Sequence, residues 1–215
     1  LHWEHTSGDY VLNQTMYVSG YGVDASLYQD GSSLKVPSSI GTAGYKGKIQ
    51  WKDFVSGADV TLYKVRPQAP EKNLNGNMGA DNSELQTAAE FDAYTDYSRT
   101  LGERFEVNAG VKASCYLSPE NKTFWGLSPA LSLSYNAYQM GKVTASSSYQ
   151  HQYLFQTGLS NIGLPIDFWF MAGSHSLPQS ALSGSLSYEV GLQNDMYRLS
   201  MEVYGKRLYN QVEYN

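Results

Sequence analysis

The chain has 215 residues and a formal net charge of −5, from 15 lysines and arginines against 20 aspartates and glutamates. This acidic balance, without a basic stripe, argues against a nucleic-acid-binding protein. The single cysteine excludes an internal disulfide, and the sequence has no run of 18 apolar residues that would form a membrane-spanning helix.

The composition favours an all-β fold. The chain contains 18 tyrosines and 20 glycines, and only 16% of its residues are charged. No stretch keeps a helical period of 3.6 residues for three turns. Tyrosine is enriched in strands, and glycine is frequent in the turns that join them. We therefore predict that residues 1–215 belong to one all-β domain.

A strict period of two is clearest in "RFEVNAGVKASCYL", residues 104–117. Phe105, Val107 and Val111 fall on one side of an extended strand, and Glu106 and Lys112 fall on the other. Such a strand is much longer than the usual five or six residues. Comparable alternation predicts about nine strands: 11–28, 45–51, 57–65, 84–97, 104–117, 126–138, 142–156, 181–192 and 196–208.

The predicted connections alternate between short and long. The short ones contain Gly, Asn, Asp and Ser, as tight turns require; they are 53–57, 100–103, 138–141 and 192–195. The long ones lie between them and are roughly 29–44, 66–83, 118–126 and 157–180. In an antiparallel sheet this order places every short turn at one end and every long loop at the other.

Long one-sided strands with short turns at one end are typical of an antiparallel transmembrane β-barrel, so we predict a segment of such a barrel. Fourteen residues reach roughly 47 Å, which at a tilt near 45° covers a height of roughly 33 Å. Cys115 would face lipid. Six aromatic residues would form an interfacial girdle: Tyr45, Trp51, Phe54, Phe105, Tyr135 and Tyr197. The alternative is a soluble sandwich or lipocalin-like barrel, whose strands rarely run this long.

The candidate ligand-binding residues lie in long loops or near the predicted outer rim. His151 and Tyr153 belong to "YQHQY", and Asp167 and Trp169 belong to "LPIDFWF". His175 follows in the same long loop. Exposed aromatic residues in loops often mark ligand contact. The alternative is that the histidines are only solvated and that the loop aromatics pack onto other loops or into the lumen.

Catalysis and metal binding are not expected. Glu90, Asp92 and Asp96 share one strand face at a spacing that a glycosidase could use, but no cleft accompanies them. His2 and His5 fall on opposite faces of a strand and cannot share a metal ion. We therefore predict neither an enzyme, nor a metal site, nor a cofactor.

The sequence from 164 to 214 resembles the late barrel of TonB-dependent outer-membrane receptors of the Bacteroidetes type. The resembling elements are "GLPIDFW", "LPQSA", "SGSLSYEVGL" and "YRLSMEVYGKRLYNQVEY". Upstream, "FEVNAGVKASCY" and "LSPALSLSY" are similar to earlier barrel strands of that family, with Ala130 at a position where arginine is common.

The resemblance implies a 22-stranded barrel in the outer membrane, filled by an N-terminal plug domain. Such a receptor imports a small nutrient ligand, for example a siderophore, cobalamin, glycan or peptide, with energy from the TonB protein. The implied partners are outer-membrane lipid and, through a longer parent chain, the plug domain and TonB. Nine strands without a plug would form only part of that barrel. Two other hypotheses are a small self-contained outer-membrane barrel, acting as an adhesin or structural protein, and a soluble β-rich binding protein.

Overall fold

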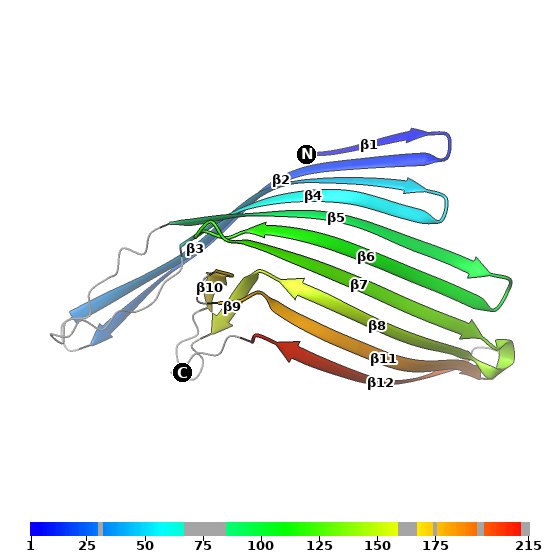
Figure 1. Cartoon of the computed structure of the whole chain (residues 1–215). Helices are drawn as coiled ribbons and strands as arrows, with labels where there is room; N and C mark the ends of the chain where they lie inside the picture. Colours follow the sequence, from blue (N-terminus) through cyan, green and yellow to red (C-terminus); the bar gives the residue numbers. More distant parts are fainter. Residues whose placement is uncertain (30–31, 67–84, 159–166, 174–175, 193–195, 212–215) are drawn as a thin grey trace.

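The computed structural model describes residues 1–29, 32–66, 85–158, 167–173, 176–192 and 196–211, with the backbone alone described at 24–29, 32–37, 157–158 and 167–168. These residues form one ten-stranded sheet and a separate two-stranded hairpin (Figure 1). The sheet strands are β1 (His2–Ser7), β2 (Tyr10–Gln29), β3 (Ser32–Trp51), β4 (Phe54–Arg66), β5 (Gln86–Leu101), β6 (Phe105–Leu117), β7 (Thr123–Asn136), β8 (Lys142–Gln152), β11 (Gln179–Leu192) and β12 (Tyr197–Tyr209). The hairpin consists of β9 (Leu154–Gly158) and β10 (Asp167–Met171), and a 3₁₀ turn, η1 (Tyr138–Met140), joins β7 to β8.

Every pair of neighbouring strands in the sheet is antiparallel, and the spatial order follows the chain except where the hairpin intervenes between β8 and β11. The all-β prediction is confirmed. The sheet has two open edges, β1 and β12. Within the described ranges no helix is long and apolar enough to span a membrane.

The two faces of the sheet differ in chemistry because the register keeps the alternation in step from strand to strand. Val107 pairs with Leu133, and the next pair along the two strands is Asn108 with Ser132. A row of residues paired in this way across neighbouring strands is a rung of the sheet. The apolar face is the side that carries Val107 and Leu133. The polar face is the side that carries Asn108 and Ser132.

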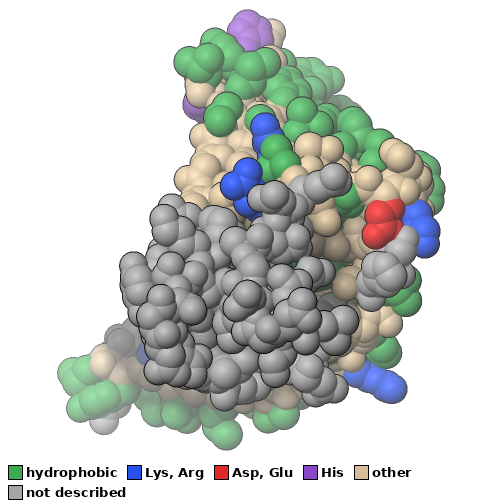
Figure 2. Space-filling model, turned by 90° about the vertical axis from the view of Figure 1, so that its left-hand side faces the viewer, with side chains coloured by type: hydrophobic (Ala, Val, Ile, Leu, Met, Phe, Trp, Pro, Cys, Tyr) green, Lys and Arg blue, Asp and Glu red, His purple; other side chains and the backbone are tan. Residues whose placement is uncertain are grey.

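The apolar face is largely uncovered. Exposed large side chains on it come from β1 to β12 and include Trp3, Val18, Ile49, Leu62, Phe91, Val111, Leu131, Leu186, Met201 and Val203. Figure 2, which views the long-loop end, shows hydrophobic side chains along the margin of the molecule. A soluble domain would bury such a face, because contiguous apolar patches of this size are rare on soluble monomers.

Aromatic rings gather on the apolar face beside the short turns. Tyr10, Trp51, Phe54 and Tyr97 lie on four successive strands, with neighbouring ring centroids 5.9, 6.4 and 5.0 Å apart. Five of the six residues predicted for the girdle lie within two residues of a strand end at this edge: Trp51, Phe54, Phe105, Tyr135 and Tyr197. The placement of Tyr45 was wrong, because β3 is longer than expected and Tyr45 pairs with Met16 and Val60 inside it.

The turns do not lie on a line perpendicular to the strands. β5 runs four residues beyond its pairing with β4, to Leu101, and β11 runs three residues beyond its pairing with β8, to Leu192. From β2 to β12 this stagger amounts to roughly 27 Å along the strands over a width of roughly 38 Å. Relative to the line of turns, the strands are therefore tilted by about 35°.

Four predicted segments differ from the structure. Residues 29–44 were predicted as a loop, but most of them continue β2 and β3 as a ribbon whose outer pairs, from Val23↔Ser38 to Gln29↔Ser32, lie beyond the pairing with β4. The predicted loop at 118–126 is shorter, since β7 begins at Thr123. The predicted strand 142–156 is interrupted at Tyr153, and the predicted loop 157–180 contains β10. The predicted loop at 66–83 lies almost entirely outside the described residues.

The predicted arrangement of short turns at one end of the sheet is present in the structure. The connections β1–β2, β3–β4, β5–β6 and β7–β8 all lie at the same end (Figure 1), whereas residues 193–195 of the predicted turn 192–195 lie outside the described residues. Positive φ angles at Gly8, Gly102 and Gly141, where L side chains are strained, let the chain reverse within a few residues. The hairpin and the long β2–β3 ribbon lie at the opposite end, the long-loop end.

Candidate functional site

A row of charged side chains crosses the polar face from β3 to β6. Lys46 pairs with Asp59, which in turn pairs with Asp92 on β5. Lys112 on β6 reaches Asp92, with Nζ 3.3 Å from Oδ2. Like charges directly opposite each other destabilise a sheet, so the two lysines offset the Asp59–Asp92 repulsion. The row is a balanced ionic network of the kind that lines a hydrated surface.

Glu90 extends this network toward the long-loop end. The hydroxyl of Tyr63 donates a hydrogen bond to Glu90 Oε2 at 2.7 Å. Glu90, Asp92 and Asp96 share the polar face, as predicted from their spacing. Glu90 accepts the hydrogen bond from Tyr63, and Asp92 forms an ion pair with Lys112. In the described part of the chain, no group of three or more His, Cys, Asp or Glu side chains is arranged to hold a metal ion.

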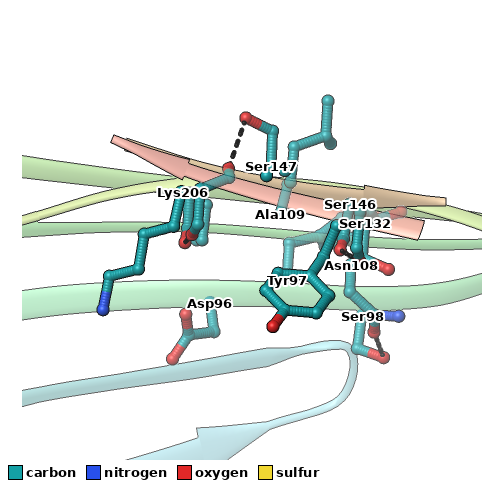
Figure 3. A pocket seen from close by; sticks show the side chains of 18 residues that line it. Asp96, Tyr97, Ser98, Asn108, Ala109, Ser132, Ser146, Ser147 and Lys206 are labelled. Atoms are coloured by element: carbon teal, nitrogen blue, oxygen red, sulfur yellow. Dashed lines mark hydrogen bonds between the residues drawn. The ribbon is translucent and has the colours of Figure 1, made fainter. Parts of the chain in front are cut away.

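Beyond the charged row lies a shallow trough of about 450 Å³ on the polar face, lined by six strands from β5 to β12 (Figure 3). Asp96 and Lys206 point into it from opposite sides. Its floor consists mainly of small hydroxyl side chains: Ser132, Ser146, Ser148, Ser183 and Ser185. The trough therefore offers a smooth polar surface with charges only at its margins.

The serines of the trough are paired with one another. Ser146 contacts Ser185 and Ser148 contacts Ser183, each pair at 2.9 Å between hydroxyl oxygens. Cross-strand hydroxyl pairs of this kind stabilise a sheet modestly. They also hold these four side chains close to the surface of the sheet, because each hydroxyl already has a partner on the neighbouring strand.

A bulge in β8 turns "YQHQY" toward the polar face. The register Ala130↔Ser148 would place Gln150 opposite Ser128, yet the side chain that contacts Ser128 Oγ is His151, at 3.2 Å. One extra residue in β8 relative to β7 is the signature of a β-bulge, which re-aims side chains near the end of a strand. Tyr149 and His151 then lie on one side, with ring centroids 4.9 Å apart.

The two predicted ligand-binding residues His151 and Tyr153 differ in their exposure to solvent. His151 is half-buried and lines a hollow of about 400 Å³ together with Lys112 and Ser128. Tyr153 is only 2% exposed and stacks on Tyr116 with centroids 4.7 Å apart. His151 is therefore accessible from the polar face, whereas Tyr153 is part of the packing. Ligand binding by either residue stays a prediction.

The hairpin β9–β10 covers the polar face at the long-loop end. Its residues Phe155 and Met171 form a buried cluster with Tyr116, Val65 and Ala88 of the sheet. Trp169 is half-buried against the same cluster. Of the two alternatives for "LPIDFWF", the structure thus supports inward packing for Trp169. Asp167 is a residue of β10 whose side chain is outside the described part, and His175 lies outside the described residues.

Gly126 makes this packing possible. A Cβ at Gly126 would collide with the hydroxyl of Tyr153 and would lie 3.0 Å from Cγ of His151. We expect Gly126→Ala to displace Tyr153 and destabilise the hairpin by about 1–3 kcal/mol. Hydrogen–deuterium exchange of residues 154–158 and 167–171 would measure this as faster exchange.

The matched control for that measurement is Gly184→Ala. A Cβ at Gly184 would meet only the carbonyl oxygen of Ser146, at 3.6 Å, an ordinary contact. We expect unchanged exchange in the hairpin for Gly184→Ala. Equal exchange in both variants would show that the space at Gly126 does not hold Tyr153 in place.

Most of the trough could not be predicted from the sequence. Its side chains Asn108, Ser132 and Ser185 were recognised only as the polar half of the alternation, with no signal that they lie together. The register, which depends on turn lengths, is what aligns them.

When the chain is compared with known proteins, it matches no protein-family model, no curated protein and no solved structure.

Proposed function

We propose that this chain forms part of the wall of an outer-membrane β-barrel. The observation that supports the proposal is the uncovered apolar face, which extends over ten strands while the opposite face is polar and ionic. Lipid would cover the apolar face and water or a polar domain would fill the lumen, which the polar face would line.

The dimensions of the strands support the same proposal. β4 to β7 contain between 13 and 16 residues, which corresponds to roughly 44–54 Å. At the tilt of about 35° they would cover roughly 36–45 Å along the membrane normal, close to the thickness of a bilayer with its headgroup regions. The aromatic row beside the turns would then lie at the inner interface.

We propose further that the barrel belongs to a TonB-dependent importer of a small nutrient and that the chain has no catalytic role. The support is the resemblance of "SGSLSYEVGL" and "YRLSMEVYGKRLYNQVEY", which form β11 and β12, to late strands of that family. The open edges at β1 and β12 fit a section of a larger barrel, since an exposed edge strand invites pairing. In this proposal the plug domain and TonB act through the parent chain, and the long-loop end faces the ligand.

The topology across the membrane can be tested with spin labels at two adjacent residues, Leu131→Cys and Ser132→Cys, in a cysteine-free background of the native polypeptide. Leu131 lies on the apolar face and Ser132 on the polar face. In outer-membrane vesicles we expect the label at 131 to be relaxed preferentially by oxygen, and the label at 132 by a water-soluble nickel complex. Identical behaviour of the two labels would contradict the barrel-wall proposal.

The mass of the native polypeptide tests the importer part of the proposal. From detergent-extracted outer membranes we expect a chain about three times or more the 23.9 kDa of this one, as a plugged 22-stranded barrel requires. A native mass near 23.9 kDa would contradict the importer and leave a small self-contained barrel. Recovery only in the soluble fraction would contradict both.

A further inference from the structure

A second hollow, of about 590 Å³, lies on the apolar face near the long-loop end and is lined by strands β2 to β6. Across these strands one rung alternates large and small side chains: Val18, Ala43, Leu62, Ala89 and Leu117. The large side chains are exposed, Val18 by 86% and Leu62 by 53%. The small ones therefore form the floors of two short furrows over β3 and β5, which end at Tyr45 and Phe91 on the adjacent rung toward the short turns.

On the next rung toward the long-loop end, β2 and β3 both carry glycine and so have no side chain. Gly20 pairs with Gly41, which pairs with Lys64. Neither glycine has a positive φ, and a Cβ at Gly41 would meet Lys64 only at ordinary contact distances of 3.8 and 3.9 Å. Neither backbone conformation nor packing requires glycine there. The effect of the two glycines is to keep the furrow over β3 open to its end.

One cation, Lys64, lines the end of the hollow, and a second, Arg66, follows two residues further along β4. Leu62, Lys64 and Arg66 occupy alternate positions of β4 and therefore project from the apolar face. Lys64 and Arg66 are both exposed, and no ion pair with either is found among the described residues. The carboxylates of β4 and β5 lie on the polar face: Asp59, Glu90, Asp92 and Asp96.

A polar group closes the same end of the hollow. Asn121, which lines it, belongs to the tight turn between β6 and β7. This turn is fixed by a hydrogen bond from the amide of Asn121 to the carbonyl of Ser118 at 3.0 Å, and by another from the amide of Lys122 to Ser118 Oγ at 3.1 Å. Apolar furrows therefore lead to a cationic and polar end, which is the profile of an amphiphile with an anionic head.

We infer that this hollow binds one anionic membrane lipid, with its acyl chains along the furrows and its phosphate at Lys64 and Arg66. The inference rests on the proposed position in the membrane, where the long-loop end meets the outer leaflet. A guanidinium can bind a phosphate through two parallel hydrogen bonds, and a lysine adds a point charge. The furrows distinguish this lipid from a free anion, which needs no apolar surface.

The experiment uses the native polypeptide, delipidated in detergent, and native mass spectrometry with dimyristoyl phosphatidylglycerol or dimyristoyl phosphatidylcholine. We expect one molecule of the anionic lipid to be retained in preference to the zwitterionic one. The double variant Lys64→Gln/Arg66→Gln should weaken retention of the anionic lipid roughly thirtyfold. The control Lys48→Gln removes a cation from the polar face and should change nothing.

Two further measurements separate the parts of the inference. Ala43→Leu, which fills the furrow over β3 and leaves both cations in place, should weaken lipid retention, and excess inorganic phosphate should not displace the lipid. Equal retention by all variants, or displacement by phosphate alone, would overturn the inference. If the spin labels at 131 and 132 behave alike, the barrel-wall proposal itself fails. With distinct labels, loss of lipid preference contradicts only the lipid site.

Discussion

Arginine in place of Val111 is expected to destabilise the folded protein in a bilayer by about 2–4 kcal/mol, because the proposed barrel wall places this residue on the lipid face near the middle of the membrane. Val111 lies in the middle of β6 on the apolar face, between Thr95 and Pro129 of the neighbouring strands. A guanidinium at this position would have no carboxylate beside it, because the paired residues on both neighbouring strands are uncharged. The free energy of unfolding in urea, measured in lipid vesicles, gives the effect.

The control for Val111→Arg is Ala130→Arg on the neighbouring strand. Ala130 pairs with Gly110, one rung from Val111, but it is exposed on the polar face beside the trough. We expect a change within about 0.5 kcal/mol for Ala130→Arg. If both variants lose the same stability, the two faces do not differ in solvent and the apolar face is not covered by lipid.

Removal of the Phe155 ring is expected to detach the hairpin β9–β10 from the sheet. Phe155 is 3% exposed, pairs with Phe170 and packs in the cluster that joins the hairpin to Tyr116 and Val65. Phe155→Ala should cost about 3–5 kcal/mol. Since a two-stranded hairpin is only marginally stable alone, we expect local opening, not loss of the whole sheet.

Limited proteolysis of the native polypeptide in membranes measures this opening. We expect rapid cleavage within 154–171 in Phe155→Ala while the sheet stays protected. The control is Phe105→Ala, which removes an exposed phenylalanine ring at the short-turn end of the sheet, away from the hairpin. Unchanged protection of the hairpin in Phe155→Ala would mean that the buried cluster does not anchor it.

The sequence predicted the sheet well where alternation is strict and turns are short. Predicted segment 104–117 and β6, Phe105–Leu117, differ by one residue at the start. The opposite faces of His2 and His5 are also confirmed, because His2 pairs with Thr15 and His5 with Leu12. Period two fixes the face of a side chain once the strand is known.

The prediction failed where tertiary context overrides local signals. "GSSLKVPSS" contains turn-forming residues, yet residues 32–39 continue β3, because pairing with β2 decides their conformation. The hairpin strand β10 was hidden in a predicted loop, since its aromatic residues find their partners on the sheet surface and not in their own alternation. The β8 bulge was not visible either, because it depends on the register with β7.

The paired serines of the trough have a consequence for anything that moves along this wall. A body sliding past Ser146–Ser185 and Ser148–Ser183 meets hydroxyls that are already satisfied, so it neither gains nor forfeits strong bonds at any one step. On β12 the same rungs continue with Tyr204 beside Ser185 and Lys206 beside Ser183, so long side chains stand at one margin of the paired serines. As part of the proposed barrel wall, the paired serines would offer a moving polar body few free hydrogen-bonding groups, in contrast to the ionic row at Asp92–Lys112, which would hold a polar partner in one place.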